Sequence, residues 1–212
     1  MSDDLISRLS ADLRPAPKGL VAGRLIGGLL TGGLVSALLT AAMLGVRPDL
    51  GAAAGQWMFW VKSGYTFALA VFAVWACERL VRPAGAARAR LAWLLAPFLV
   101  LAVLAGWRLA QARAADRAAL ILGHSASVCP WLILAFSAPP LLGLIWAARG
   151  LAPTRLRLAG WVLGLAAGGA GATAYALHCD EMAAPFLMVW YSLGVMATGL
   201  LGRLLAPRLL RW

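Results

Sequence analysis

The sequence predicts an all-α protein: a polytopic membrane bundle of six transmembrane helices, preceded by a short amphipathic helix on the cytoplasmic side. Three observations lead to this class. Hydrophobic residues make up 62% of the 212 residues and charged residues only 13%, whereas a soluble domain carries about 25% charged residues. Six long apolar runs follow one another, and the basic residues concentrate in alternate connections. Because so little polar surface remains to cover a water-soluble globule, a globular cytosolic enzyme is excluded.

Residues 2–13 have the pattern of a short amphipathic helix. Their apolar residues fall on one face at helical spacing, at Leu5, Ile6, Leu9 and Leu13. Arg14 ends this helix, because a residue that precedes a proline disfavours the α conformation. We therefore divide the chain into a cytoplasmic segment, residues 1–24, and a six-span membrane domain, residues 25–212.

The six apolar runs are long enough to cross a bilayer, since a helix needs roughly 20 residues to span a core of about 30 Å. They lie at 25–46, 57–77, 91–107, 127–147, 158–177 and 186–205. Pro97 interrupts the third run, and Pro139 and Pro140 interrupt the fourth. We expect both helices to be kinked or locally unwound there, because proline cannot complete the helical hydrogen-bond pattern.

The orientation follows from the basic residues near the ends of the runs, which favour the cytoplasmic side. With the N-terminus inside, the inner segments hold 14 of the 19 lysines and arginines. Both termini are therefore expected in the cytoplasm. Lys62, near the outer end of the second run, is interpreted as an anchor that snorkels to the surface. The net charge of +11 is explained by such anchors, so no direct nucleic-acid binding is expected.

Glycines recur at four-residue spacing in two of the runs, at Gly23, Gly27, Gly28, Gly32, Gly164 and Gly168. Such pairs let helix backbones approach closely within the bilayer. The spacing favours packing inside one bundle, and a homodimer face is the alternative.

Soft metal ligands gather on the outer face of this topology. Cys129 and Cys179 lie there together with His124 and His178, the two histidines of the chain, whereas Cys77 lies at the inner end of the second run. An oxidisable thiol pair is one interpretation. A thiol–imidazole site that binds a soft metal transiently, with the histidines assisting, is another. A structural disulfide or unrelated interfacial residues are also consistent with the spacing.

The sequence gives little support for catalysis or transport. No carboxylate lies in the middle of a run, which disfavours a proton-coupled transporter. The chain lacks a phosphate-binding P-loop, an HExxH motif and a Gly-x-Ser-x-Gly elbow. A small membrane thiol-disulfide oxidoreductase is the alternative function, and the absence of a CxxC pair disfavours it. We therefore expect a non-enzyme without a resident cofactor.

The N-terminal helix either lies on lipid headgroups or docks onto a protein. Its polar face carries Asp3, Asp4 and Asp12, whereas helices on lipid surfaces prefer basic polar faces. This difference favours a cytoplasmic protein partner that has basic residues and an apolar groove for the leucine face.

Several segments together resemble the NrsF family of bacterial six-helix inner-membrane proteins. They are residues 3–15, 45–50, 129–130, 175–181, 190–194 and 209–212, of which Tyr-Ala-Leu-His-Cys at 175–179 is the most specific. The resemblance implies an anti-sigma factor that holds an extracytoplasmic-function sigma factor at the membrane through its N-terminus. It also implies release under heavy-metal or oxidative stress, with Cys129 and Cys179 as the required cysteines. Cys77 has no counterpart in the family pattern.

Overall fold

The computed structural model describes residues 19–82, 87–151 and 153–210, and within these ranges it contains helices and connections but no β-strand. The predicted all-α class is confirmed. The elements are α2 (Leu20–Met43), α3 (Leu50–Ala54), α4 (Trp57–Leu80), α5 (Arg88–Trp93), α6 (Leu95–Gln111), α7 (Ala114–Leu122), α8 (Cys129–Phe136), α9 (Ala138–Ala148), α10 (Leu156–Tyr175), α11 (Ala184–Phe186), the π-helical turn η1 (Leu187–Tyr191) and α12 (Ser192–Leu209).

Five helical stretches of the described chain are long and apolar enough to cross a membrane. They are Leu20–Met43, Trp57–Leu80, Arg88–Gln111, Cys129–Ala148 and Ala184–Leu209. Each overlaps one of the predicted runs, so the chain has the helices of a multi-pass membrane protein. The remaining predicted run, 158–177, forms α10, which is rich in glycine and alanine and is not among these five.

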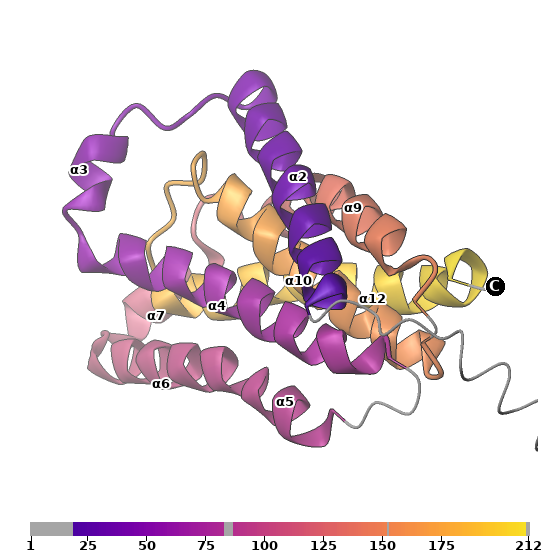
Figure 1. The fold of residues 1–212 in the computed structure, drawn as a ribbon. Helices are drawn as coiled ribbons and strands as arrows, with labels where there is room; N and C mark the ends of the chain where they lie inside the picture. Colours follow the sequence, from indigo (N-terminus) through magenta and orange to yellow (C-terminus); the bar gives the residue numbers. More distant parts are fainter. Residues whose placement is uncertain (1–18, 83–86, 152, 211–212) are drawn as a thin grey trace, which may run out of the picture.

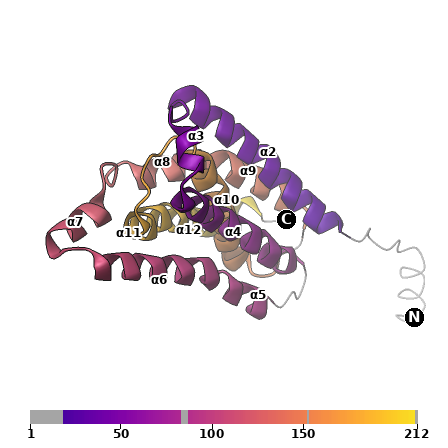
Figure 2. The ribbon, with the colours of Figure 1, turned by 90° about the vertical axis from the view of Figure 1, so that its left-hand side faces the viewer.

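The glycine-rich helix α10 lies at the centre of the bundle, between α4 on one side and α12 on the other (Figures 1 and 2). Small residues on its different faces allow close approach. A Cβ at Gly164 would meet the backbone of Gly199 on α12 at 2.7 Å, and one at Gly169 would meet the amide nitrogen of Ala70 on α4 at 2.7 Å. α10 is therefore surrounded by protein, which explains why it needs fewer large apolar residues than the helices at the periphery.

Two of the three predicted glycine pairs pack inside the bundle. Gly28 and Gly32 of α2 approach α9, where they meet Gly143 and Pro140 respectively. Gly164 and Gly168 of α10 approach α12. A Cβ at Gly23 or Gly27 would meet nothing within 4 Å in the described structure.

The prolines break the two helices as predicted. α5 ends at Trp93, four residues before Pro97, and α8 ends at Phe136, four residues before Pro140. The spacing has a physical cause: a proline ring clashes with the carbonyl four residues earlier and has no N–H to bond with it. The third and fourth predicted spans therefore each consist of two helical pieces, α5 with α6 and α8 with α9.

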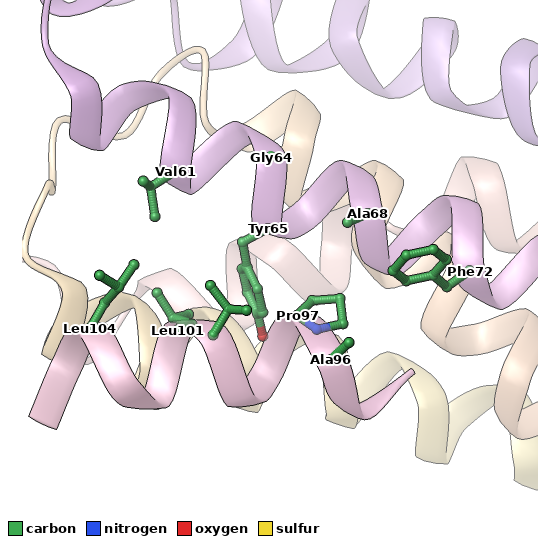
Figure 3. A pocket seen from close by; sticks show the side chains of 10 residues that line it. Val61, Gly64, Tyr65, Ala68, Phe72, Ala96, Pro97, Leu101 and Leu104 are labelled. Carbon is green, nitrogen blue, oxygen red and sulfur yellow. The ribbon is translucent and has the colours of Figure 1, made fainter. Parts of the chain in front are cut away.

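Helix α6 stands partly apart from α4, and an apolar cavity of about 330 Å³ lies between them. Figure 3 shows Tyr65 reaching from α4 toward α6 among the side chains that line this cavity. The hydroxyl of Tyr65 is hydrogen-bonded to Ser192 Oγ at 2.7 Å, and none of the side chains that line the cavity is charged. The cavity therefore offers apolar contact and no reactive group.

The helix ends gather at two opposite ends of the bundle. At one end, Arg24 of α2 donates a hydrogen bond to the carbonyl of Arg149, whose own side chain donates to the carbonyl of Leu209. At the other end, the amide of Arg47 donates to the carbonyl of Leu177. We call the first the arginine-rich end, with Arg24, Arg79, Arg82, Arg88, Arg90, Arg149, Arg155, Arg157, Arg203 and Arg208, and the second the cysteine end, with Cys129 and Cys179.

Candidate functional site

Two cysteines that are 50 positions apart in the sequence meet at the cysteine end. Cys129 is the first residue of α8, and its amide donates to the carbonyl of Ser125 at 2.8 Å. Cys179 lies in the connection after α10, and its amide donates to the carbonyl of Tyr175 at 3.0 Å. Both thiols are free and buried, with exposed fractions of 0% and 3%. The predicted grouping of these two cysteines is therefore present as a contact.

The surroundings of Cys179 favour its charged form. A hydrogen bond from the Cys129 thiol, and next the positive charge of Lys62, lower the pKa of the Cys179 thiol below its ordinary value, although burial acts in the opposite direction. A thiolate is the reactive form of cysteine. Of the two thiols, Cys179 is therefore the one whose charged form the surroundings favour, with Cys129 as the hydrogen-bond donor beside it.

The interpretation of Lys62 as a surface anchor is wrong. The side chain is 1% exposed, and its Nζ atom donates to the carbonyls of Cys179 at 2.7 Å and Glu181 at 3.1 Å. The same ammonium lies 5.0 Å from the centre of the Tyr191 ring. These carbonyls and the ring face α4 from inside the bundle, so Lys62 finds there the polar partners that snorkelling would otherwise provide.

Tyr191 completes the buried cluster. Its side chain is fully buried in η1, and its hydroxyl lies beside the Cys179 thiol as a second donor that favours the charged form of that thiol. The ring lies 6.0 Å from the ring of Tyr175 on α10. Buried hydroxyls are rarely left unpaired, and π-helical turns occur often at functional sites. No periodicity in the sequence indicates this residue.

Glu181 joins the two connections that carry the cysteines. Its buried carboxylate accepts hydrogen bonds from the amides of His124 and Ser125, which precede α8. Gly123 allows this approach, since its φ is +54° and a Cβ there would collide with the carboxylate. The connection after α10 is therefore fastened to the connection before α8, and the two thiols are held together.

Arg47 supports the same connection from the end of α2. Its guanidinium forms two hydrogen bonds of 2.7 Å with the carboxylate of Asp49 and a longer one, 3.4 Å, with the carbonyl of Cys179. The hydrogen bonds from Arg47 lower the pKa of Asp49 below its ordinary value. The carbonyl of Cys179 thus accepts from two cationic side chains, Lys62 and Arg47.

The two histidines lie at the edge of this site rather than within it. The His124 side chain is 98% exposed and lies 3.6 Å from the Glu181 carboxylate, while His178 Nδ1 lies 3.1 Å from the carbonyl of Gly45. Across the described ranges, no group of three or more His, Cys, Asp or Glu side chains is arranged to hold a metal. The assisting role of the histidines at a metal stays a prediction.

The predicted docking residues lie outside the described residues: Asp3, Asp4, Leu5, Ile6, Leu9, Asp12 and Leu13. Lys62 is the member of the cluster that the sequence could have indicated, because an ionisable residue inside an apolar run marks a functional site by default. Glu181 gave a weaker signal as a carboxylate beside a histidine and a cysteine. The residue types of Lys62 and Glu181 indicate a functional role, whereas their contacts cannot be predicted from the sequence.

The sequence matches the family described as "NrsF: Negative regulator of sigma F" over residues 9–212. The anti-sigma-F factor NrsF of Caulobacter vibrioides is 44% identical over 214 residues, which cover 100% of this chain and 99% of the relative. The probable anti-sigma-F factor NrsF of Azospira oryzae is 37% identical over 211 residues, with coverage of 100% and 99%. No solved structure matches the chain.

Proposed function

The chain belongs to the NrsF family of negative regulators of sigma F, and on this premise we propose that it is a membrane-embedded anti-sigma factor. It sequesters a sigma factor of the extracytoplasmic-function type at the bacterial inner membrane and releases it under oxidative or heavy-metal stress. The family is regulatory and not enzymatic. The observation that carries the sensing part of this proposal is the buried contact between Cys129 and Cys179 at one end of the bundle.

The proposed topology has six spans, with α10 as the fifth to cross and both termini in the cytoplasm. The grouping of the arginines at the end where α2 begins and α12 ends supports this orientation, because basic residues favour the cytoplasmic side. Reporter fusions that are active only in the periplasm should give signal in residues 47–56, 108–126 and 178–185. A periplasmic signal from a fusion at the N-terminus would contradict the orientation.

The proposed docking element is the segment 2–13, with its leucine face and its three aspartates. Deletion of residues 2–14 should free the sigma factor and leave insertion intact, because the apolar spans remain. Leu9→Asp should weaken docking strongly, since burial of one aliphatic side chain contributes roughly 1.5–3 kcal/mol. Transcription of the target genes measures release, and immunoblots of membranes measure accumulation. Silent target genes in both variants, at normal protein levels, would show that docking lies elsewhere.

The proposed signal is oxidation of the thiol pair to a disulfide. The Cys179 thiolate attacks one oxygen of a hydroperoxide, so that an S–O bond forms, the O–O bond breaks and the departing oxygen takes up a proton. The Cys129 thiol then displaces the remaining hydroxyl from the Cys179 sulfur, and its proton leaves with that hydroxyl as water. The peroxide gains two electrons, and the two sulfurs lose them. Heavy-metal stress acts on the same two thiols.

Cys129→Ser and Cys179→Ser should each abolish induction by oxidant or metal and preserve repression in unstressed cells. Cys77→Ser is the matched control, because that buried thiol lies near the end of α4 that is remote from Lys62 and the thiol pair. Thiol labelling of denatured membranes should find both cysteines free before stress and protected after it. A pair that is already oxidised in unstressed cells would be a structural disulfide, and the sensing proposal would fail.

A homodimer through the open face at Gly23 and Gly27 stays a prediction.

A further inference from the structure

We propose that Lys62 is the positioning residue of the thiol pair: it supplies the buried counter-charge of Cys179 and ties the main chain at that cysteine to α4. This inference deepens the proposed sensing function and rests on it. Lys62 is only 1% exposed although it lies within an apolar helix, and the family resemblance does not explain this burial.

The hydrogen bonds of Lys62 fix the position of Cys179. Nζ donates to the carbonyl of Cys179 at 2.7 Å and to the carbonyl of Glu181 at 3.1 Å, so it bridges the two residues that flank Asp180. These bonds span 117 and 119 positions of sequence. The connection after α10 has no regular secondary structure between Asp180 and Ala183, and its geometry therefore depends on side chains that reach it. Lys62 is one of them, and it comes from a rigid helix.

The charge of Lys62 requires a partner. Moving an ammonium group out of water is costly unless an anion or several oxygens compensate it. The two carbonyls and the Tyr191 ring compensate part of the charge, and the titratable group whose charge acts on Lys62 most strongly is the Cys179 thiol. The other titratable and charged groups around Cys179 are Arg47, Cys129, Tyr175, Asp180, Glu181 and Tyr191.

Among these groups, Lys62 is the cation that acts on the Cys179 thiol most strongly. Arg47 is already engaged by two hydrogen bonds with Asp49, so its charge is largely neutralised. The Glu181 carboxylate is turned toward the amides of His124 and Ser125. Lys62 therefore has Cys179 as its anion, and Cys179 has Lys62 as its cation.

Oxidation removes this arrangement. In the reduced pair, one thiolate balances one ammonium, whereas the disulfide is neutral and leaves the ammonium without a counter-charge. The hydroxide that departs from hydrogen peroxide can take the Lys62 proton, so that one thiolate, one thiol, one ammonium and one hydrogen peroxide become a disulfide, an amine and two waters. Once Lys62 is a neutral amine, the attachment of α4 to the connection at Cys179 is weaker than before oxidation, because a charged donor forms stronger hydrogen bonds than a neutral one.

The test measures how fast hydrogen peroxide oxidises the pair in the purified full-length chain in detergent, with Cys77→Ser so that only the pair responds. The reaction is quenched with acid at set times, and the remaining thiols are counted by maleimide labelling and intact mass. The rate is followed from about pH 5 to pH 10. Lys62→Met and Lys62→Gln remove the charge, Lys62→Arg keeps it, and Arg108→Met removes an exposed charge at the same end as a matched control.

The charge-free variants should oxidise at least about tenfold more slowly near pH 7, with the midpoint of the pH profile moved upward, since each unit of thiol pKa changes the thiolate fraction about tenfold. Lys62→Arg should stay within about threefold of the parent, and Arg108→Met should match it. Charge-free variants with the parental rate and midpoint would overturn the proposal. If they do not fold, the parent decides: a midpoint at or above the ordinary cysteine pKa of about 8.5 would overturn it as well.

This outcome is separable from the proposed function. If Cys179→Ser blocks induction in cells while Lys62→Met leaves the oxidation profile unchanged, the sensing function stands and the role of Lys62 fails. If Lys62→Met slows oxidation while Cys179→Ser leaves induction intact, the chemistry at Lys62 stands and the sensing function fails.

Discussion

The close packing of the central helix α10 gives a prediction whose size follows from the structure. Gly164→Ala adds a methyl group that would lie 2.7 Å from the Cα of Gly199 and 3.0 Å from the carbonyl carbon of Thr198, both on α12. These are backbone atoms, which cannot rotate away as a side chain can. Gly27→Ala is the matched control, because its methyl group would meet nothing within 4 Å.

The free energies of unfolding of the two variants share the effect of helix propensity and differ in the cost of overpacking. Alanine in place of a helical glycine stabilises by roughly 0.5–1 kcal/mol, and this gain applies at both positions. Overpacking of a close contact costs about 1–3 kcal/mol, and this cost applies at Gly164 alone. The free energy of unfolding should therefore be lower in Gly164→Ala than in Gly27→Ala by about 1–3 kcal/mol, which is the packing cost with the helix propensity cancelled.

Reversible unfolding in mixed micelles measures this difference, with tryptophan fluorescence and circular dichroism as independent probes of one transition. Gly27→Ala should unfold at or slightly above the parental denaturant fraction, and Gly164→Ala below it. Equal stabilities for the two variants would refute the close approach of α10 and α12, and with it the central position of α10.

Four further substitutions test the cysteine end and the break between α8 and α9. Glu181→Ala leaves the amides of His124 and Ser125 without their acceptor and should lower the free energy of unfolding by about 1–3 kcal/mol, whereas Glu181→Gln, which keeps an oxygen, should lose less in the same mixed-micelle assay. Ser36→Ala removes the hydroxyl that donates to the carbonyl of Phe136 at 2.6 Å and should cost about 1–3 kcal/mol, with Ser63→Ala as the control; no loss would mean that this carbonyl has another donor. Tyr191→Phe removes a buried hydroxyl that lies beside the Cys179 thiol and has no oxygen or nitrogen partner in the described chain, so its stability should fall by no more than about 1 kcal/mol, and a larger loss would show a stronger bond at this hydroxyl. Asp49→Asn tests the ion pair with Arg47. The pKa of Asp49 is lowered in the folded state, so its charge stabilises the protein above the ordinary pKa of about 3.9, and this effect is lost as the pH falls through the folded value. The thermal midpoint of the variant should therefore lie below that of the parent at pH 7, and the two midpoints should converge in acid.

The helices and their breaks could be predicted because they depend on local properties of the chain. Hydropathy located five runs that the structure has as candidate spans, and two prolines located the breaks that end α5 and α8. The central position of α10 could not be predicted from hydropathy, since a helix surrounded by protein and a helix of marginal apolarity look alike in composition. Only the contacts of its glycines distinguish them.

The candidate site could be predicted in part. Topology alone brought Cys129 and Cys179 to one face, because one opens a run and the other follows one. Their contact depends on Glu181 and Lys62, whose partners are 56 to 119 positions away in sequence. Lys62 was misinterpreted for a physical reason: a lysine near the end of a span satisfies the snorkelling rule equally well whether its helix turns it toward lipid or toward the bundle. That rotation is decided by packing, which periodicity does not show in a helix that is apolar all round.

One hydrogen bond connects α8, the helix that Cys129 opens, to α2, the helix that follows the proposed docking segment. Because residue 140 is a proline, the carbonyl of Phe136 has no helical donor four residues later, and Ser36 of α2 donates to it instead at 2.6 Å. Cys129 opens the same short helix, α8, that ends at this carbonyl. A pull on Cys129 would therefore shift a rigid piece of eight residues whose far end is bonded to α2. α2 in turn begins at the arginine-rich end, directly after the N-terminal segment. A disulfide at one end of the bundle thus has a short mechanical route to the other, through one helix, one hydrogen bond and a second helix.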